Sequence, residues 1–131
     1  MGEKKPELHQ SAEDYLECIL KLSKVKPVVR SIDIAVEMNY SKPSISVAMK
    51  NLRTNGYIEM DKSGFITLTD AGREIAEKIY DRHYYLTEGL VRLGVDRKIA
   101  EKDACRVEHD LSPETFAILK EHIVRFLKPE E

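Results

Sequence analysis

Three residues of metal-binding type lie close together near the carboxyl-terminal end of the sequence. Glu108 and His109 follow Cys105 by three and four positions, a spacing that places side chains on one face of a helix. A thiolate, a carboxylate and an imidazole are all ligands of divalent transition metals. This segment therefore predicts part of a metal site.

Further residues of the same types occur in two other predicted helices. Asp14 and Glu17 are three residues apart near the start of the chain, and His83 lies in a long helical segment. Side chains from three helices are able to complete the shell of one divalent ion. The predicted metal-site residues are therefore Asp14, Glu17, His83, Cys105, Glu108 and His109.

Each of these residues also has a structural interpretation. Asp14 could form part of a helix cap, and Glu17 could pair with Lys21 four positions later. Cys105 could be a small buried apolar residue, and His83 an exposed residue of an amphipathic helix. The sequence leaves both interpretations open for each residue taken singly.

The elements that must position these residues follow from capping signals and hydrophobic periodicity. Serine or proline precedes or opens several helical segments, and glycine follows two of them. A polar turn between two short apolar runs predicts a hairpin. We expect helices at about 12–24, 31–39, 41–55, 71–93, 96–109 and 113–127, and strands at 57–60 and 65–68. The predicted fold is mainly α with a small β-hairpin.

A helix, a tight turn, a second helix and a hairpin, in that order, predict a winged helix-turn-helix in residues 31–68. In such a module the second helix enters the DNA major groove, and the hairpin contacts the adjacent backbone. We expect Ile45, Val47, Ala48 and Leu52 to form the buried side of the second helix. A DNA-binding protein is the resulting interpretation.

Polar residues on the other side of this helix are the candidates for DNA contacts. Side chains of Lys, Ser and similar residues bind phosphates or base edges, and the amino terminus of a helix favours a phosphate. The alternative is that they are ordinary exposed residues on a three-helix core. The predicted DNA-binding residues are Ser41, Lys42, Pro43, Ser44, Ser46, Lys50 and, in the wing, Lys62.

The net charge of −2 conceals an uneven distribution. Residues 21–75 carry nine Lys/Arg and six Asp/Glu, and the rest of the chain carries twelve and seventeen. The middle segment is therefore suited to an acidic partner and the flanks to a cation. The absence of a long apolar run and the charged amino terminus predict a cytoplasmic protein without a membrane segment. Two widely separated cysteines fit a reducing compartment.

Several ordered motifs together resemble the diphtheria toxin repressor family. They are S-A-E-D-Y-L-E at 11–17, the helix-turn-helix with its wing, R-H at 82–83, L-G-V-D at 93–96 and A-C-R-V-E-H-D-L-S at 104–112. This family, which includes a manganese transport regulator branch, consists of metal-activated transcriptional repressors. The resemblance extends from about residue 10 to 127.

The resemblance implies a winged helix-turn-helix domain in residues 1–74 and a helical metal-binding and dimerisation domain in residues 75–131. Because the chain ends at Glu131, we expect the compact two-domain form. A homodimer would bind double-stranded palindromic operator DNA and control metal homeostasis genes, without enzymatic activity. Apolar residues expected in the dimer core are Phe116, Ile118, Leu119, Ile123, Phe126 and Leu127.

The metal preference implied by the resemblance is mixed. Asp14 and Glu17 resemble the manganese branch, whereas Cys105 resembles the iron-responsive branch. Mn²⁺ is favoured and Fe²⁺ comes next, with Co²⁺ or Zn²⁺ able to bind in vitro. At two positions of the family's ancillary metal site this chain has Thr87 and Glu101, neither of which matches the iron-type ligands.

Two other functions are compatible with parts of the sequence. One is a metal-independent winged-helix regulator that responds to a small ligand or a protein partner, which would leave the six predicted ligands unexplained. The other is a metal-dependent hydrolase, because carboxylates, histidine and thiols are also catalytic groups. We rank catalysis last because a wing has no role in it.

Overall fold

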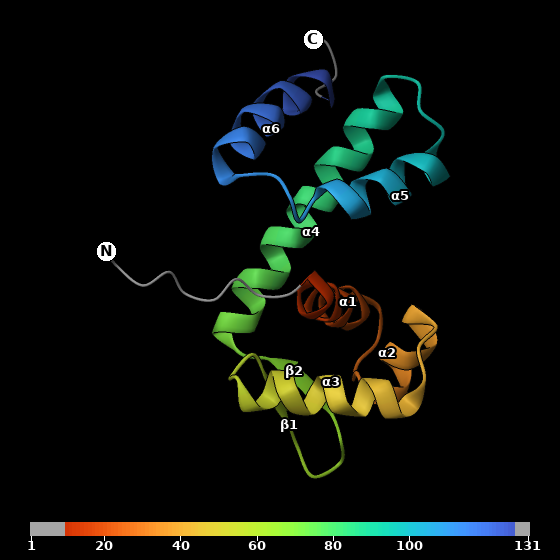
Figure 1. The fold of residues 1–131 in the computed structure, drawn as a ribbon, viewed down its shortest axis with the longest axis vertical. Helices are drawn as coiled ribbons and strands as arrows, with labels where there is room; N and C mark the ends of the chain where they lie inside the picture. Colours follow the sequence, from red (N-terminus) through yellow and green to blue (C-terminus); the bar gives the residue numbers. More distant parts are fainter. Residues whose placement is uncertain (1–9, 128–131) are drawn as a thin grey trace, which may run out of the picture. The chain divides into compact units, whose positions relative to one another are not determined.

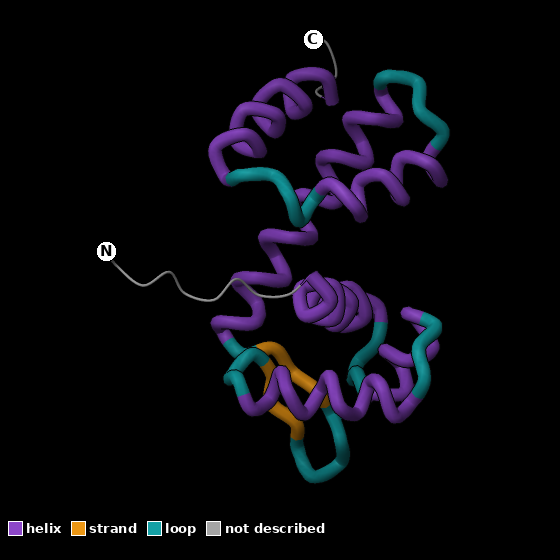
Figure 2. Tube along the Cα trace, viewed as in Figure 1, coloured by secondary structure: helices purple, strands orange, loops and turns teal. Residues whose placement is uncertain are grey.

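A computed structural model describes residues 10–127 of the 131-residue chain. The described residues form six helices and one two-stranded antiparallel sheet (Figure 2). The chain divides into a first unit, up to Glu77, and a second unit, from Lys78 onward. Within residues 10–127, no helix combines the length and the apolar character that crossing a membrane requires.

The first unit packs three helices against a hairpin (Figure 1). The helices are α1 (Gln10–Val25), α2 (Ser31–Met38) and α3 (Lys42–Thr54), and the strands are β1 (Ile58–Met60) and β2 (Ile66–Leu68). Apolar residues at helical spacing turn to a common core. Among its fully buried members are Leu16, Ile19, Ile34, Ile45, Met49 and Ile58.

Local signals set the turn between α2 and α3. Asn39 ends α2 with a φ of 57°, a left-handed conformation that asparagine adopts more readily than most residues. Ser41 then caps α3, because its Oγ accepts a hydrogen bond from the Ser44 amide at 3.3 Å. Pro43 follows in the first turn, where its missing amide proton costs nothing. The predicted helix-turn-helix is confirmed.

The hairpin is closed by a side chain and anchored by a main-chain bond. Asp61 Oδ1 accepts hydrogen bonds from the amides of Ser63 and Phe65, both at 2.9 Å. The Ile66 amide donates to the carbonyl oxygen of Val29 at 2.7 Å. The hairpin is therefore fixed to the segment between α1 and α2.

The second unit is helical. α4 (Asp70–Arg92) begins in the first unit and continues into the second, where α5 (Arg97–Val107) and α6 (Pro113–Leu127) follow. Gly89 of α4 allows a close approach, since a Cβ there would lie 3.0 Å from Ile123 Cδ1 of α6. Buried apolar residues of this unit include Ile79, Ala100, Ala104, Phe116 and Ile123. The predicted fold class, mainly helical with a two-stranded hairpin, is confirmed.

Val47 was placed on the wrong side of α3. Its side chain is 61% exposed, and Met49 occupies the core with Ile45 and Leu52. At 3.6 residues per turn, a position two residues from Ile45 lies about 200° around the helix. The residue that shares the face of Ile45 is therefore four positions later.

Two helix ends differ from the predictions by two residues. α1 begins at Gln10, two residues before its predicted start. α5 ends at Val107, two residues earlier than predicted. α2 begins at Ser31 as predicted, with Arg30 as its cap, and the Arg30 amide donates to the Asp33 carboxylate at 2.9 Å. Apolar periodicity places helix ends only to within one or two residues.

Candidate metal centre and nucleic-acid interface

Glu108 is the central residue of the predicted metal segment. It follows the last residue of α5 but keeps helical dihedral angles, with φ −57° and ψ −28°. The predicted helical spacing from Cys105 therefore still holds at Glu108, although the helix itself has ended. The Glu108 side chain has no solvent exposure.

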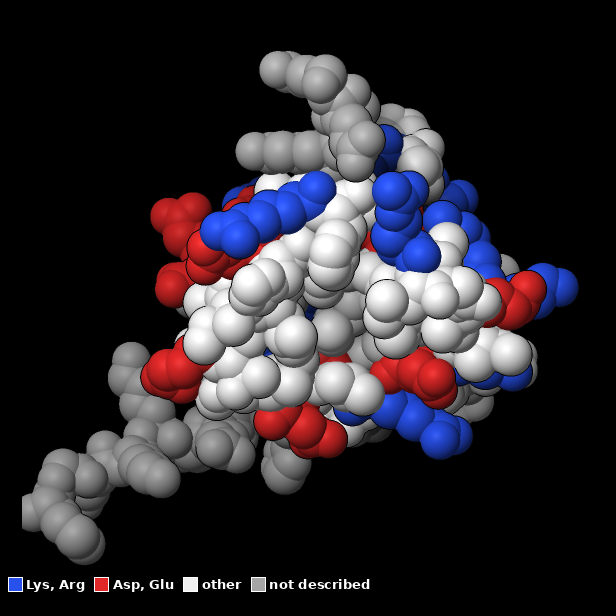
Figure 3. Space-filling view, turned by 90° about the horizontal axis from the view of Figure 1, so that it is seen from above, with Lys and Arg blue, Asp and Glu red and all other residues white. Residues whose placement is uncertain are grey.

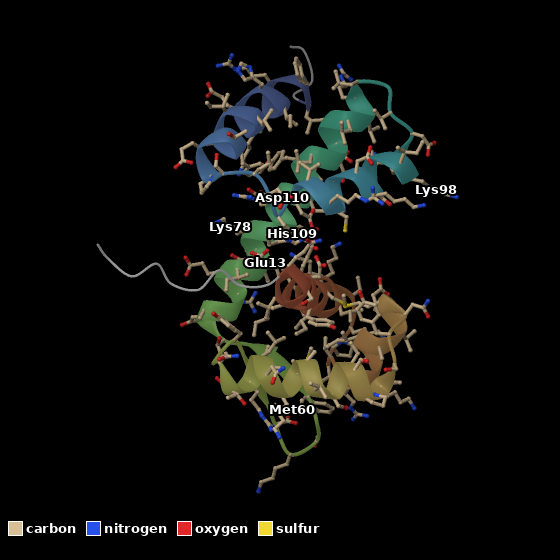
Figure 4. The ribbon with its side chains drawn as sticks, viewed as in Figure 1. Glu13, Met60, Lys78, Lys98, His109 and Asp110 are labelled. Carbon is tan, nitrogen blue, oxygen red and sulfur yellow. The ribbon has the colours of Figure 1, made fainter. Side chains whose placement is uncertain are left out.

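Two histidines flank the Glu108 carboxylate. His83 Nδ1 of α4 lies 2.9 Å from Glu108 Oε2, and His109 Nε2 lies 3.5 Å from Glu108 Oε1. His109 belongs to the segment after α5 (Figure 4). The side chains of His83 and His109 are only 19% and 3% exposed. A buried carboxylate thus lies between two imidazoles.

Cys105 completes a group of possible ligands with His83 and Glu108. The three residues each offer one ligand atom, and these atoms lie within 4.8 Å of one another. With metal–ligand bonds of about 2.0–2.3 Å, two ligands on opposite sides of an ion are about 4.5 Å apart. Cys105 is exposed, so its alternative interpretation as a buried packing residue is wrong.

The donor set fits a divalent transition metal. Within residues 10–127, Glu108 Oε1 is buried and has no hydrogen-bond partner. A buried carboxylate oxygen in that state is costly unless a cation or a donor compensates it. Imidazole nitrogen, thiol sulfur and carboxylate oxygen together suit Mn²⁺, Fe²⁺ or Zn²⁺.

Arg82 binds the main chain of residues 108–111, and it was not among the predicted site residues. Its side chain is buried, and Nη1 donates to the carbonyl oxygens of Glu108 at 2.9 Å and Leu111 at 2.6 Å. The guanidinium carbon lies 5.3 Å from the centre of the Phe116 ring. A sequence signal existed, because Arg82 follows the apolar Ile79 by three positions and so falls on the same helix face.

The first unit holds the two remaining predicted ligands on α1. Glu17 is 4% exposed, and its carboxylate lies 3.6 Å from the Lys21 ammonium. The predicted Glu17–Lys21 pairing is therefore present, and Asp14 is half-buried one turn earlier. Cys18 is buried, and this burial raises its pKa to about 11. Cys18 thus belongs to the buried core of the first unit.

The two positions that correspond to an ancillary site differ in their burial. Thr87 is buried, and the Glu88 carboxylate pairs with Arg97 Nη1 at 2.7 Å. This hydrogen bond raises the pKa of Arg97. Glu101 is exposed on α5.

Six of the seven predicted DNA-binding residues lie on the solvent-exposed surface of α3 and its cap. No acidic residue occurs in α3, and a uniformly neutral or basic surface is compatible with phosphates. Ser41 and Ser44 bind each other, because Ser41 Oγ donates to Ser44 Oγ at 2.8 Å. Residues of this surface that the structure places in solvent are Ser41, Lys42, Pro43, Ser44, Ser46 and Lys50.

Lys62 is exposed in the hairpin turn, which follows Met60 (Figure 4). The neighbouring Asp61 would repel DNA if it faced a phosphate. However, the Oδ1 atom of Asp61 accepts two amide hydrogen bonds within the turn. Lys62 is thus the basic side chain that this turn presents to solvent.

Both halves of the chain match models of known domains. Residues 7–64 match the N-terminal DNA-binding domain of iron-dependent repressors, and residues 69–128 match their metal-binding and dimerisation domain. An uncharacterised HTH-type transcriptional regulator of Methanocaldococcus jannaschii is 36% identical over 121 residues, which cover 91% of this chain and 97% of that protein. The chain belongs to the iron-dependent repressor family. Members of this family are transcriptional regulators and not enzymes.

Other members of the iron-dependent repressor family are also similar. The transcriptional regulator MntR of Escherichia coli is 35% identical over 104 residues, covering 79% of this chain and 67% of MntR. A solved structure of a manganese-dependent transcriptional repressor with manganese superposes with a TM-score of 0.78 at 27% identity. The match covers 86% of this chain and 52% of that one. The chain thus spans about half the length of the solved repressor structure.

Proposed function

We propose that this protein is a repressor that binds palindromic operator DNA as a homodimer when it is loaded with Mn²⁺ or Fe²⁺, and that it controls metal homeostasis genes. The observation that carries the proposal is the gathering of His83, Cys105 and His109 around the buried carboxylate of Glu108. This gathering occurs in the domain that the family uses for metal binding.

The ligands are proposed to come from both units. His83, Cys105, Glu108 and His109 would hold the ion from the second unit, and a bound cation would supply the charge that balances Glu108. Asp14 and Glu17 are proposed ligands because of their residue types and their spacing on α1. Ligands on both units would favour one arrangement of the two domains, and operator DNA would favour the same arrangement. Such coupling is typically worth about 1 to 3 kcal/mol.

Manganese is the proposed first choice and iron the second. Asp14, Glu17 and Glu108 offer hard oxygen ligands that suit Mn²⁺, whereas Cys105 adds a softer ligand that also binds Fe²⁺, Co²⁺ or Zn²⁺. The similar MntR and the manganese-bound repressor support manganese.

The proposed dimer surface lies on the second unit. Phe116 and Ile123 are buried within one copy of the chain, so the prediction that they contribute to the dimer core needs correction. Ile118 and Phe126 are 59% and 52% exposed and are available to a second copy. In Figure 3, residues other than Lys, Arg, Asp and Glu fill the middle of the face shown, and charged residues lie toward its edges. Sedimentation of the metal-loaded protein with operator should show a dimer, and monomer alone would contradict this part.

DNA binding scanned across metals tests the whole proposal. Random DNA would be selected with the Mn²⁺-loaded protein, and its affinity then measured with Mn²⁺, Fe²⁺, Co²⁺, Zn²⁺ and a chelator at fixed salt. We expect an increase of about 5-fold to 150-fold with the preferred metal. Equal affinity with and without every metal would instead support the metal-independent regulator.

A further inference from the structure

Val47 occupies the centre of the solvent-exposed face of α3. The core residues Ile45, Met49 and Leu52 lie within an arc of about 60° when each residue advances 100° around the helix. Val47 lies about 180° from the middle of that arc, with Pro43 one turn before it. Its side chain is 61% exposed, so packing within the domain does not account for a branched apolar residue here.

The surroundings of Val47 suit DNA. Lys50 lies three positions later on the same face, and Lys42 and Arg53 are exposed nearer its edge. No acidic residue interrupts this helix. A protein interface centred on one valine would have to desolvate these cations, whereas DNA pairs them with phosphates. The occupant that fits the whole face is therefore a major groove.

We propose that Val47 contacts the C5-methyl group of a thymine and so determines one base of each operator half-site. The inference rests on the proposed function, because it requires α3 to lie in the groove. Among the base edges of the major groove, the thymine methyl is the apolar group, and apolar side chains recognise it. Cytosine would present an N4 donor and no methyl group at the same place.

Valine is suited to this role because it has no hydrogen-bonding group and little freedom. One χ1 rotamer dominates for valine in helices, so its two methyl groups keep a fixed direction. The neighbouring Ser46 and Lys50 are able to bind phosphates or polar base edges and would not select a methyl group. The specificity is thus assigned to Val47 and not to the cations beside it.

Deoxyuridine substitution tests the contact, because it removes only the methyl group of a thymine. DNA would be selected from a random pool with the metal-loaded protein, and each thymine replaced singly by deoxyuridine. At one thymine per half-site we expect wild type to lose about fourfold in affinity, the effect of one buried methyl-sized group. Val47→Ala should lose affinity for the unmodified DNA and respond to that replacement by less than about 1.5-fold.

Val36→Ala is the matched control, because Val36 is 74% exposed on α2 and undergoes the same truncation. It should keep the wild-type response to deoxyuridine. If the response persists in Val47→Ala, or if no thymine shows it, the inference is wrong although the protein still binds DNA. If no DNA is selected with or without metal, the proposed function fails and the inference fails with it. DNA selected without any metal dependence would contradict only the metal part, and the thymine test would still decide the role of Val47.

Discussion

The surroundings of Glu108 and the exposed surface of α3 use polar residues in opposite ways. Around Glu108, side chains from α4 and from the segment after α5 surround one buried carboxylate. On α3, the polar residues come from a single helix and its cap, and they lie in solvent. The arrangement of the polar side chains around Glu108 therefore depends on tertiary packing, whereas on α3 it follows from the geometry of one helix.

This difference has an energetic consequence. Removing one member of a buried polar cluster leaves its partners uncompensated, so single substitutions have large and non-additive effects. When one exposed side chain is removed, water takes its place, and only the interaction energy of that side chain is lost. We therefore expect single substitutions near Glu108 to change binding strongly, and single substitutions on α3 to change it by smaller steps.

Glu108→Gln should give the largest effect. The variant keeps the shape of the side chain but replaces the only buried carboxylate of the second unit's ligand group with an amide. Its operator affinity should become independent of metal, a loss of the whole increase of about 5-fold to 150-fold. Measuring affinity against Mn²⁺ concentration checks this.

Glu101→Gln is the control for this substitution, because Glu101 is an exposed acid of α5, the helix that ends just before Glu108. It should retain the metal response. A normal response in Glu108→Gln would remove Glu108 from the ligand set.

The two cysteines should differ about a hundredfold in their rate of alkylation. Cys18 is 7% exposed and Cys105 is exposed, and a local opening that costs about 3 kcal/mol slows reaction by roughly that factor. Iodoacetamide labelling followed by mass spectrometry measures both rates. Mn²⁺ or Zn²⁺ should protect Cys105 and leave Cys18 unchanged. Equal labelling of Cys105 with and without metal would contradict its role as a ligand.

Much of the first unit was predictable because several of its boundaries have a local cause. Ser41 and Pro43 begin α3, Asn39 ends α2, and the Asp61 side chain closes the turn of the hairpin. These signals act over four residues or fewer, and they are visible in the sequence. Helical periodicity alone would have predicted that Val47 is exposed, but our prediction placed it on the buried face of α3.

The candidate metal centre was less predictable. Residue types and spacing indicated Cys105, Glu108 and His109, and His83 was predicted as a further ligand from another helix, but its direct contact with Glu108 at 2.9 Å was not predicted. That contact joins residues 25 positions apart and depends on how α4 packs with the segment after α5. Helical periodicity places Arg82 on the buried face of α4, but its partners were not predictable, because they are main-chain carbonyls, which every residue possesses.

Arg82→Met should weaken metal binding by about tenfold to a hundredfold, as the loss of groups that orient ligands commonly does. The substitution removes both hydrogen bonds to the Glu108 and Leu111 carbonyls while keeping an unbranched apolar stem. Calorimetric titration with Mn²⁺, at a temperature where the variant is folded, measures the affinity. Arg82→Lys should restore part of it by supplying one donor. A lowered Tm with unchanged Mn²⁺ affinity would show that Arg82 only stabilises the fold.

Lys50→Ala should have the smallest effect and should reveal itself in the salt dependence. If each Lys50 of a dimer neutralises one phosphate, the slope of log K against log salt should become shallower by about 1.8. Affinity should fall by a similar factor for every DNA sequence, since a phosphate contact carries no base information.

Filter binding at several salt concentrations, with Lys98→Ala as control, separates a lysine that contacts phosphates from one that does not. Lys98 is exposed on α5 of the second unit (Figure 4), so its loss should leave the slope unchanged. An unchanged slope in Lys50→Ala would place Lys50 away from the phosphates, and a sequence-dependent loss would make it a base-reading residue beside Val47.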